Sequence, residues 1–184
     1  MSDLDAQWKR ALPALREGLE AAFGALIRDC EAPLEALDRV PPTAGWTRHE
    51  VLEHVALTDH YLLILIDKIA DRTRRRLERG DPWPVHGPSF APLQRLASSE
   101  RDWEAPLHMV PSDPAPPMEI TRRLDLDRKR CLALLDEFPS GEGTLHRIRM
   151  SVVDGDDRLD LYQYLEIVRL HATRHVAQIE RLKS

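Results

Sequence analysis

The chain has 184 residues, of which 42% are hydrophobic and 31% charged, and its formal net charge at pH 7 is −5. This length suits one ordinary domain whose hydrophobic core is large enough to fold without disulfides or structural metals. We therefore expect residues 1–184 to form a single domain. The hydrophobic content disfavours wholesale disorder. The acidic balance disfavours nucleic acid as a partner, because sequence-independent binding depends on neutralising phosphate charge.

The sequence also predicts where the protein resides. Its longest apolar stretch covers only residues 61–66, far short of the roughly 18 residues of a membrane span, so we expect no membrane association. The acidic first residues lack the basic and apolar regions of a secretory signal. Cys30 and Cys131 form no CxxC pair and are typical of buried thiols in a reducing compartment. We therefore expect a cytoplasmic protein.

The composition is helical and lacks several familiar catalytic signatures. Only 5% of the residues are aromatic and eight are glycine, while leucine, alanine, arginine and glutamate favour helices. The chain contains no GxGxxG, GxxxxGK[ST], GxSxG or HExxH pattern. These absences disfavour dinucleotide-binding proteins, P-loop NTPases, α/β-hydrolases and HExxH metalloproteases.

The first half of the chain predicts two long helices. Apolar residues recur at spacings of three and four from about residue 3 to 38, and Pro13 and Pro33 predict a kink or a division in that segment. A second helix is predicted to begin after Thr47, which forms a capping box with Glu50. It ends in the basic run 72–79 before a glycine, and we interpret that run as a solvated helix end rather than a nucleic-acid patch.

A long connection from about residue 81 to 117 separates the second and third helices. It holds nine of the fourteen prolines, and we expect it to lie across the bundle, with a short helix within 89–103. A third helix is predicted over 118–138, with Leu126 and Cys131 among its core candidates, followed by an irregular link over 140–160. A fourth helix is predicted over 161–182 with Asp160 as its N-cap. The expected fold is an all-α four-helix bundle with one long crossover.

Three of the eight histidines are predicted to face the core. His171 and His175 stand four residues apart on the fourth helix, which places both imidazoles on one face. Projected around that helix, His175 lies within about 20° and His171 within about 60° of the apolar stripe. His54 lies on the inner border of the stripe of the second helix, whereas His49 and His60 project away from it and are expected to be exposed.

Three inward imidazoles need polar partners. Each buried polar group without one costs roughly 1–3 kcal/mol, a large amount against a total stability of about 5–15 kcal/mol. One divalent transition metal would satisfy His54, His171 and His175 together, and three imidazoles with an open position are the ligand set of many catalytic zinc sites. Ordinary hydrogen-bonded core histidines are the alternative, and spacing alone leaves both open.

Two segments carry a resemblance to a known family. The stretch GWTRHEVLEHVA (45–56), with a histidine eight residues after the tryptophan, resembles the second-helix signature of the DinB/YfiT-like superfamily. The stretch LYQYLEIVRLHATRHVAQIERL (161–182), with its His-x-x-x-His followed by Gln-Ile, resembles the last helix of the same family. The resemblance implies a four-helix bundle with a metal held by three histidines, which correspond here to His54, His171 and His175.

The same resemblance implies two kinds of activity on a small-molecule substrate. One is metal-dependent hydrolysis; the other is S-transfer or isomerisation with a low-molecular-weight thiol that the metal would deprotonate. The ligand type points to zinc or nickel. The resemblance also suggests a homodimer. The alternative is a non-catalytic bundle that binds a ligand or partner, with the metal structural or adventitious.

Few other residues are assigned a role in the site. Asp59 is interpreted as a surface carboxylate, with a role as acceptor for an imidazole N–H as the alternative. Glu166 and Gln178 are expected to pack at the border of the fourth helix, where either could orient a ligand. Trp46 is expected to pack at the entry of the second helix. The catalytic base and any residues that bind a cofactor stay unassigned.

Overall fold

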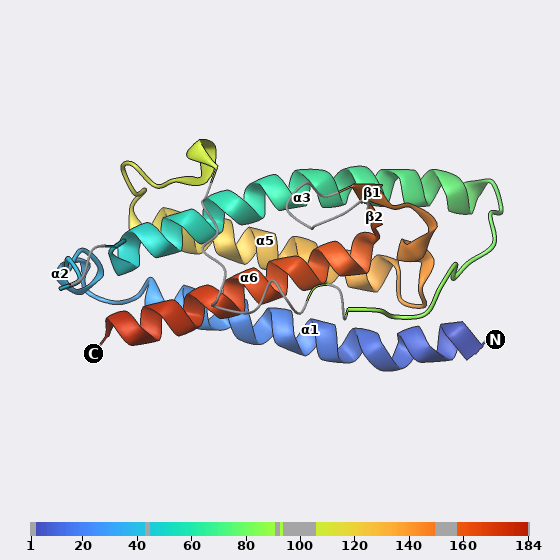
Figure 1. Cartoon of the computed structure of the whole chain (residues 1–184), viewed down its shortest axis with the longest axis horizontal. Helices are drawn as coiled ribbons and strands as arrows, with labels where there is room; N and C mark the ends of the chain where they lie inside the picture. The colour runs from blue at the N-terminus through green and yellow to red at the C-terminus, as the bar shows by residue number, and fades with distance from the viewer. Residues whose placement is uncertain (1–2, 43–44, 91–92, 94–105, 150–157, 184) are drawn as a thin grey trace.

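The computed structural model describes residues 3–42, 45–90, 93, 106–149 and 158–183, and they form an all-α bundle, as expected (Figure 1). Four long helices follow the long axis: α1 (Asp3–Asp29), α3 (Arg48–Glu78), α5 (Pro117–Glu137) and α6 (Leu161–Leu182). The shorter elements are α2 (Leu34–Leu37), the 3₁₀ turns η2 (Leu107–Met109) and η3 (Glu142–Leu145), and the antiparallel pair β1 (Ile148–Arg149) and β2 (Arg158–Leu159). No helix in the described ranges is long and apolar enough to cross a membrane.

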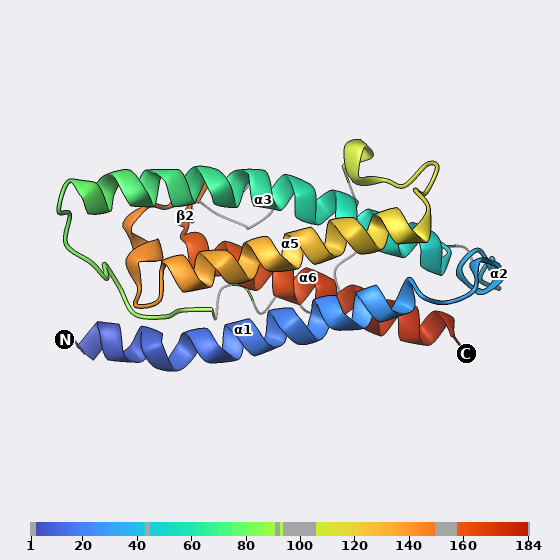
Figure 2. The same ribbon diagram turned by 180° about the vertical axis from the view of Figure 1, so that it is seen from behind.

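Each long helix packs against two of the others. Helix α1 contacts α5 and α6, and α3 contacts the same two helices from the other side. Figures 1 and 2 show that α3 and α5 run in one direction while α1 and α6 run in the other. The connection after α3 therefore leaves one end of the bundle, and α5 begins at the other. This places the first turns of α3 beside the C-terminal half of α6.

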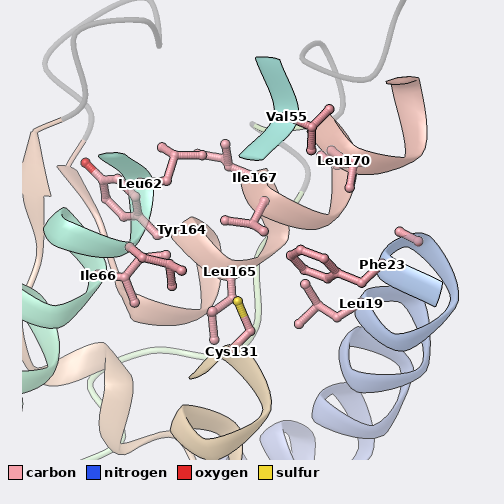
Figure 3. Packing of buried hydrophobic residues seen from close by; sticks show 14 of the residues in the cluster. Leu19, Phe23, Val55, Leu62, Ile66, Cys131, Tyr164, Leu165, Ile167 and Leu170 are labelled. Carbon is pink, nitrogen blue, oxygen red and sulfur yellow. The ribbon is translucent and has the colours of Figure 1, made fainter. Parts of the chain in front are cut away.

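The core draws on all four long helices. Figure 3 shows Phe23 of α1, Ile66 of α3, Cys131 of α5 and Leu165 of α6 converging between the ribbons. Each of these side chains is fully buried or nearly so. Cys30 is also a buried free thiol, so the expectation of core thiols is confirmed for both cysteines. Burial of this apolar surface is the main force that holds the helices together.

Both predicted N-caps are confirmed. The Thr47 hydroxyl accepts the Glu50 amide at 3.2 Å, and Glu50 Oε2 accepts the Thr47 amide at 2.7 Å. Asp160 and Gln163 form the same reciprocal pair at the start of α6. These caps fix where α3 and α6 begin, and so set the positions of the histidines that follow.

The division predicted at Pro33 is confirmed, because α1 ends at Asp29 and Pro33 is the N-cap of the separate short helix α2. Several other predicted details were wrong. Pro13 lies inside an unbroken α1, because it is on the exposed face, where water can reach the carbonyl that loses its hydrogen bond. Leu126 is 51% exposed rather than part of the core. The link after α5 holds η3 and the strand pair. A short helix was expected within 89–103, and residues 91–92 and 94–103 of that range lie outside the described residues.

Candidate metal centre

His54, His171 and His175 lie together between the first turns of α3 and the C-terminal half of α6. The Nε2 atom of His171 is 3.3 Å from that of His54 and 3.1 Å from that of His175. One ligand nitrogen from each ring lies within 4.8 Å of the other two. The sequence-predicted triad is therefore one cluster that could hold a metal ion.

The outer ring nitrogens of the triad face acceptors on three different segments. His54 Nδ1 is 2.8 Å from the carbonyl oxygen of Met109, in η2. His175 Nδ1 is 2.8 Å from Oε1 of Gln178, one turn further along α6. His171 Nδ1 is 3.8 Å from Oδ1 of Asp59, on α3. Such acceptors fix the orientation of a ligating imidazole and raise its basicity.

These contacts determine which nitrogens carry lone pairs. A carbonyl oxygen can only accept a hydrogen bond, so the proton of neutral His54 is on Nδ1 and its Nε2 is bare. The same tautomer in His175 directs its Nε2 lone pair toward the other two rings. A proton between two of the rings would satisfy one N···N pair, but only a central cation meets all three nitrogens at once.

Burial keeps the triad unprotonated at neutral pH. Burial, followed by the charges of His54 and Arg174, lowers the pKa of His171 to about 3. Burial and then the other two imidazoles lower the pKa of His175 to about 2. The pKa of His54 is also lowered, because burial outweighs its bond to Met109. Metal ligation requires neutral imidazoles, so the site is in its binding-competent protonation state.

The spacing and the donor set both suit a transition ion. Three imidazole nitrogens at about 2.0–2.1 Å from a tetrahedral ion lie about 3.3 Å from one another, close to the two short N···N distances here. Among the described residues the cluster has three members and no fourth ligand. The side chain of His171 is 19% exposed, so the cluster is not sealed. Three protein ligands and one open coordination position are typical of catalytic zinc sites.

The interpretation of Asp59 as a surface residue was wrong. It is 0% exposed, and both of its carboxylate oxygens lack a hydrogen-bond partner within the described ranges. Burial raises its pKa well above the ordinary value. On α5, Asp127 is next to it: burial and then the Asp59 charge raise the pKa of Asp127 to about 7. The sequence alternative for Asp59, an acceptor beside a histidine, is the one that its position supports.

His49 was predicted to be exposed, and this too was wrong. It is 6% exposed, because its Nδ1 contacts Asp38 at 2.8 Å and its Nε2 contacts the Ala115 carbonyl at 2.9 Å. It joins the segment before α3 to the one before α5, away from the triad cluster. His60 is exposed as expected. Trp46 packs against the His54 ring at a centroid distance of 4.7 Å, so it covers one side of the triad.

Of two further contacts of the triad, the sequence analysis offered one only as an alternative role and left the other unassigned. Gln178 was expected to be at a border, and its spacing of three residues from His175 was the available signal for a direct contact. The Met109 carbonyl belongs to the long connection, and no sequence pattern marks a backbone acceptor that arrives from a distant loop. Glu166 is buried and pairs with Arg169 at 2.6 Å, apart from the histidines.

Comparisons with known proteins place this geometry in a family. Neither the search of curated proteins nor the search of solved structures found a match. The scan against protein families matches residues 3–179 to the DinB superfamily. That match covers α1, α3, α5 and all but the last three residues of α6, and it includes each member of the triad. The chain therefore belongs to the DinB superfamily.

Proposed function

We propose that this protein is a divalent-metal-dependent enzyme in which His54, His171 and His175 hold the ion, zinc or nickel by ligand type. The observation that carries the proposal is the convergence of three Nε2 atoms whose outer nitrogens face acceptors on separate segments. Core histidines without a ligand have no need to bring three ring nitrogens to one point. The lowered pKa values of the three rings support the same conclusion.

The residues around the triad orient its rings and limit the access of water. The Met109 carbonyl and Gln178 hold the N–H groups of His54 and His175, and Asp59 is placed to hold that of His171. Trp46 excludes water from one side of His54. When bound, the metal would supply Lewis acidity that lowers the pKa of a coordinated water or thiol, which gives a nucleophile at neutral pH.

The open position decides between two reactions on a small-molecule substrate. Hydrolysis needs water there, and S-transfer needs a low-molecular-weight thiol. No cysteine of the chain competes for it, because Cys30 and Cys131 are buried in the core and burial raises the pKa of both thiols. A thiol at this site would therefore be a co-substrate rather than a side chain.

Cobalt substitution tests the proposal and separates the two reactions. Co²⁺-loaded protein is titrated with a small thiol, and we expect visible ligand-field bands that disappear in His175→Ala. A new thiolate-to-metal charge-transfer band on adding thiol indicates S-transfer; its absence, with ester hydrolysis that depends on the metal, indicates a hydrolase. If no reaction in either class depends on the triad, the alternative of a non-catalytic bundle with a structural or adventitious metal replaces the enzyme proposal.

Three broader statements stay predictions. Residues 1–184 are proposed to form one domain, since the buried cluster takes side chains from all four long helices. A cytoplasmic location and a homodimer are proposed from the sequence and the family resemblance. Sedimentation of the purified chain at about 50 µM, well above a typical micromolar affinity, tests the dimer, and a purely monomeric profile contradicts it.

A further inference from the structure

Helix α3 carries a stripe of arginines at its C-terminal end. Arg72, Arg75, Arg76 and Arg79 follow the spacing i, i+3, i+4, i+7, which places them on one face of the helix. Together with His146, which follows η3, they line a cavity of about 320 Å³. No acidic residue is among those lining residues. The cavity is therefore positively charged, although the chain as a whole is acidic.

Part of this stripe is fixed in place. Arg76 donates through Nη1 to the Leu145 carbonyl and through Nε to Asp81 Oδ2 at 2.6 Å. Arg79 reaches the same Asp81 oxygen at 3.4 Å. These contacts tie the end of α3 to η3 and build one wall of the cavity. A single carboxylate is thus shared by two of the four guanidinium groups.

The other two arginines have no such partner. Neither Arg72 nor Arg75 makes an ion pair or a side-chain hydrogen bond within the described part of the chain. The excess positive charge acts on a neighbour: burial and then Arg72 and Arg76, followed by Arg158 of β2, lower the pKa of His146. One or two basic residues suffice to complement the dipole of a helix C-terminus. Four like charges on one face repel one another, and an anion would relieve that repulsion.

We propose that this cavity binds a small oligophosphate anion, held by the guanidinium groups of Arg72 and Arg75, which have no acidic partner among the described residues, and by the wall at Arg76 and Arg79. Guanidinium forks match phosphate oxygens bidentately, and four of them suit a ligand that carries several charges. A volume of about 320 Å³ is near the lower end for small-molecule sites, which fits a compact anion better than a large cofactor.

The cavity is separate from the histidine cluster. Arg72 follows His54 by eighteen positions in α3, which at 1.5 Å per residue is about 27 Å along the helix. The arginines that line the cavity stand at the C-terminal end of α3, whereas His54 is in its second turn. Figure 1 shows the two ends of α3 at opposite ends of the bundle. The anion site does not depend on the proposed metal function.

Calorimetric titration of the full chain with inorganic triphosphate, at about 0.15 M salt, tests the proposal. We expect saturable binding of one anion per chain with a Kd below about 1 mM. The double variant Arg72→Gln/Arg75→Gln should bind at least about tenfold more weakly, because it loses charge-assisted hydrogen bonds. The matched control Arg10→Gln/Arg122→Gln removes two exposed arginines elsewhere and should leave the Kd unchanged. Circular dichroism melts establish that both variants fold.

Three results would overturn the proposal. The first is binding that does not saturate by about 5 mM triphosphate, or an equal loss of triphosphate affinity in the double variant and the control. The second is binding that disappears in His175→Ala, which would mean that triphosphate chelates a metal at the triad. The third is a single-stranded RNA oligonucleotide that binds at least about tenfold more tightly than triphosphate and depends on the same two arginines. Triphosphate binding retained in His175→Ala supports the anion site even if the metal proposal fails.

Discussion

The Nδ1 atom of His171 lies 3.8 Å from Oδ1 of Asp59, and within the described residues neither atom has a hydrogen-bond partner. A fully buried carboxylate without a partner is costly, so its position calls for a role. Within the described residues, His171 is the only triad member whose Nδ1 has no hydrogen-bond partner, and Asp59 is beside it. Asp59 is thus placed to orient His171.

Replacing Asp59 by Asn separates metal binding from folding. We expect Asp59→Asn to weaken metal affinity by about 10–100-fold, the usual cost of changing the group behind a ligating histidine, because an uncharged amide accepts more weakly than a carboxylate. The metal-free variant should be as stable as the wild type or more so at pH 8, since an unpaired buried charge is gone. Competition with a chromophoric chelator measures the affinity. Asp127→Asn is the control, because that carboxyl contacts no triad residue, and an equal loss there would contradict the role given to Asp59.

Gln178 should support His175 through its carbonyl oxygen. Gln178→Ala removes the acceptor 2.8 Å from His175 Nδ1, and we expect about a tenfold loss of metal affinity. Gln178→Glu keeps an acceptor oxygen at the same reach and should restore most of that affinity. If the alanine variant binds metal as tightly as the wild type, the contact does not position the ring.

The raised pKa of Asp127 predicts that the stability of the folded chain depends on pH. Its carboxyl pKa is raised from 3.8 to about 7 by burial and by the Asp59 charge. Between about pH 4 and 7 the folded chain therefore holds more protons at this residue than the unfolded chain, so stability falls as pH rises through 7. Asp127→Asn removes this loss and should raise the free energy of unfolding by about 1–3 kcal/mol at pH 8, with little change at pH 4.5.

Asp125 provides the control with the opposite sign. Contacts with Lys129 and then Arg128 lower its pKa, so its ionised form favours the folded state above pH 4 and that contribution is lost in acid. Asp125→Asn should therefore leave the protein slightly less stable at pH 8, whereas Asp127→Asn makes it more stable. Urea denaturation at the two pH values measures both, and a shift of the same sign would refute the assignment.

The capping box of α3 sets where the helix begins, two turns before His54. Thr47→Ala removes the hydroxyl that accepts the Glu50 amide, and we expect a loss of about 1 kcal/mol in unfolding free energy. Thr173→Ala serves as the control, because its hydroxyl bonds the Arg169 carbonyl within α6 and caps nothing. Thermal and urea melts should show a lower stability for the first variant only.

The sequence predicted those features that depend on local patterns. The starts of α3 and α6 follow from capping boxes whose two partners are three residues apart, and the inward faces of both helices follow from their apolar stripes. His54, His171 and His175 lie on those faces, so local periodicity predicted that all three point inward, and the family resemblance predicted that they form one site. The extent of burial of His54 and His175 agrees with that projection.

The errors share one physical cause, which is that a helix projection describes a helix and not its neighbours. Asp59 and His49 lie off the main stripe of α3, yet α3 packs against α5, α6, η3 and η2, so several of its faces are covered. The Met109 carbonyl comes from the long connection, whose course no pattern specifies. The prediction for Leu126 was wrong in the opposite direction: it was expected to be buried and is exposed. Nothing in the sequence marks an apolar residue on the outer face of α5 as exposed.

Metal content, measured by mass spectrometry on untagged protein, tests the central claim most directly. The wild type is compared with His54→Ala/His171→Ala/His175→Ala and with a control that lacks the exposed His60 and His108. The metal proposal predicts about one transition ion per chain in the wild type and control, and none in the triad variant. No metal in the wild type after incubation with excess zinc or nickel, or equal metal in all three proteins, would contradict it.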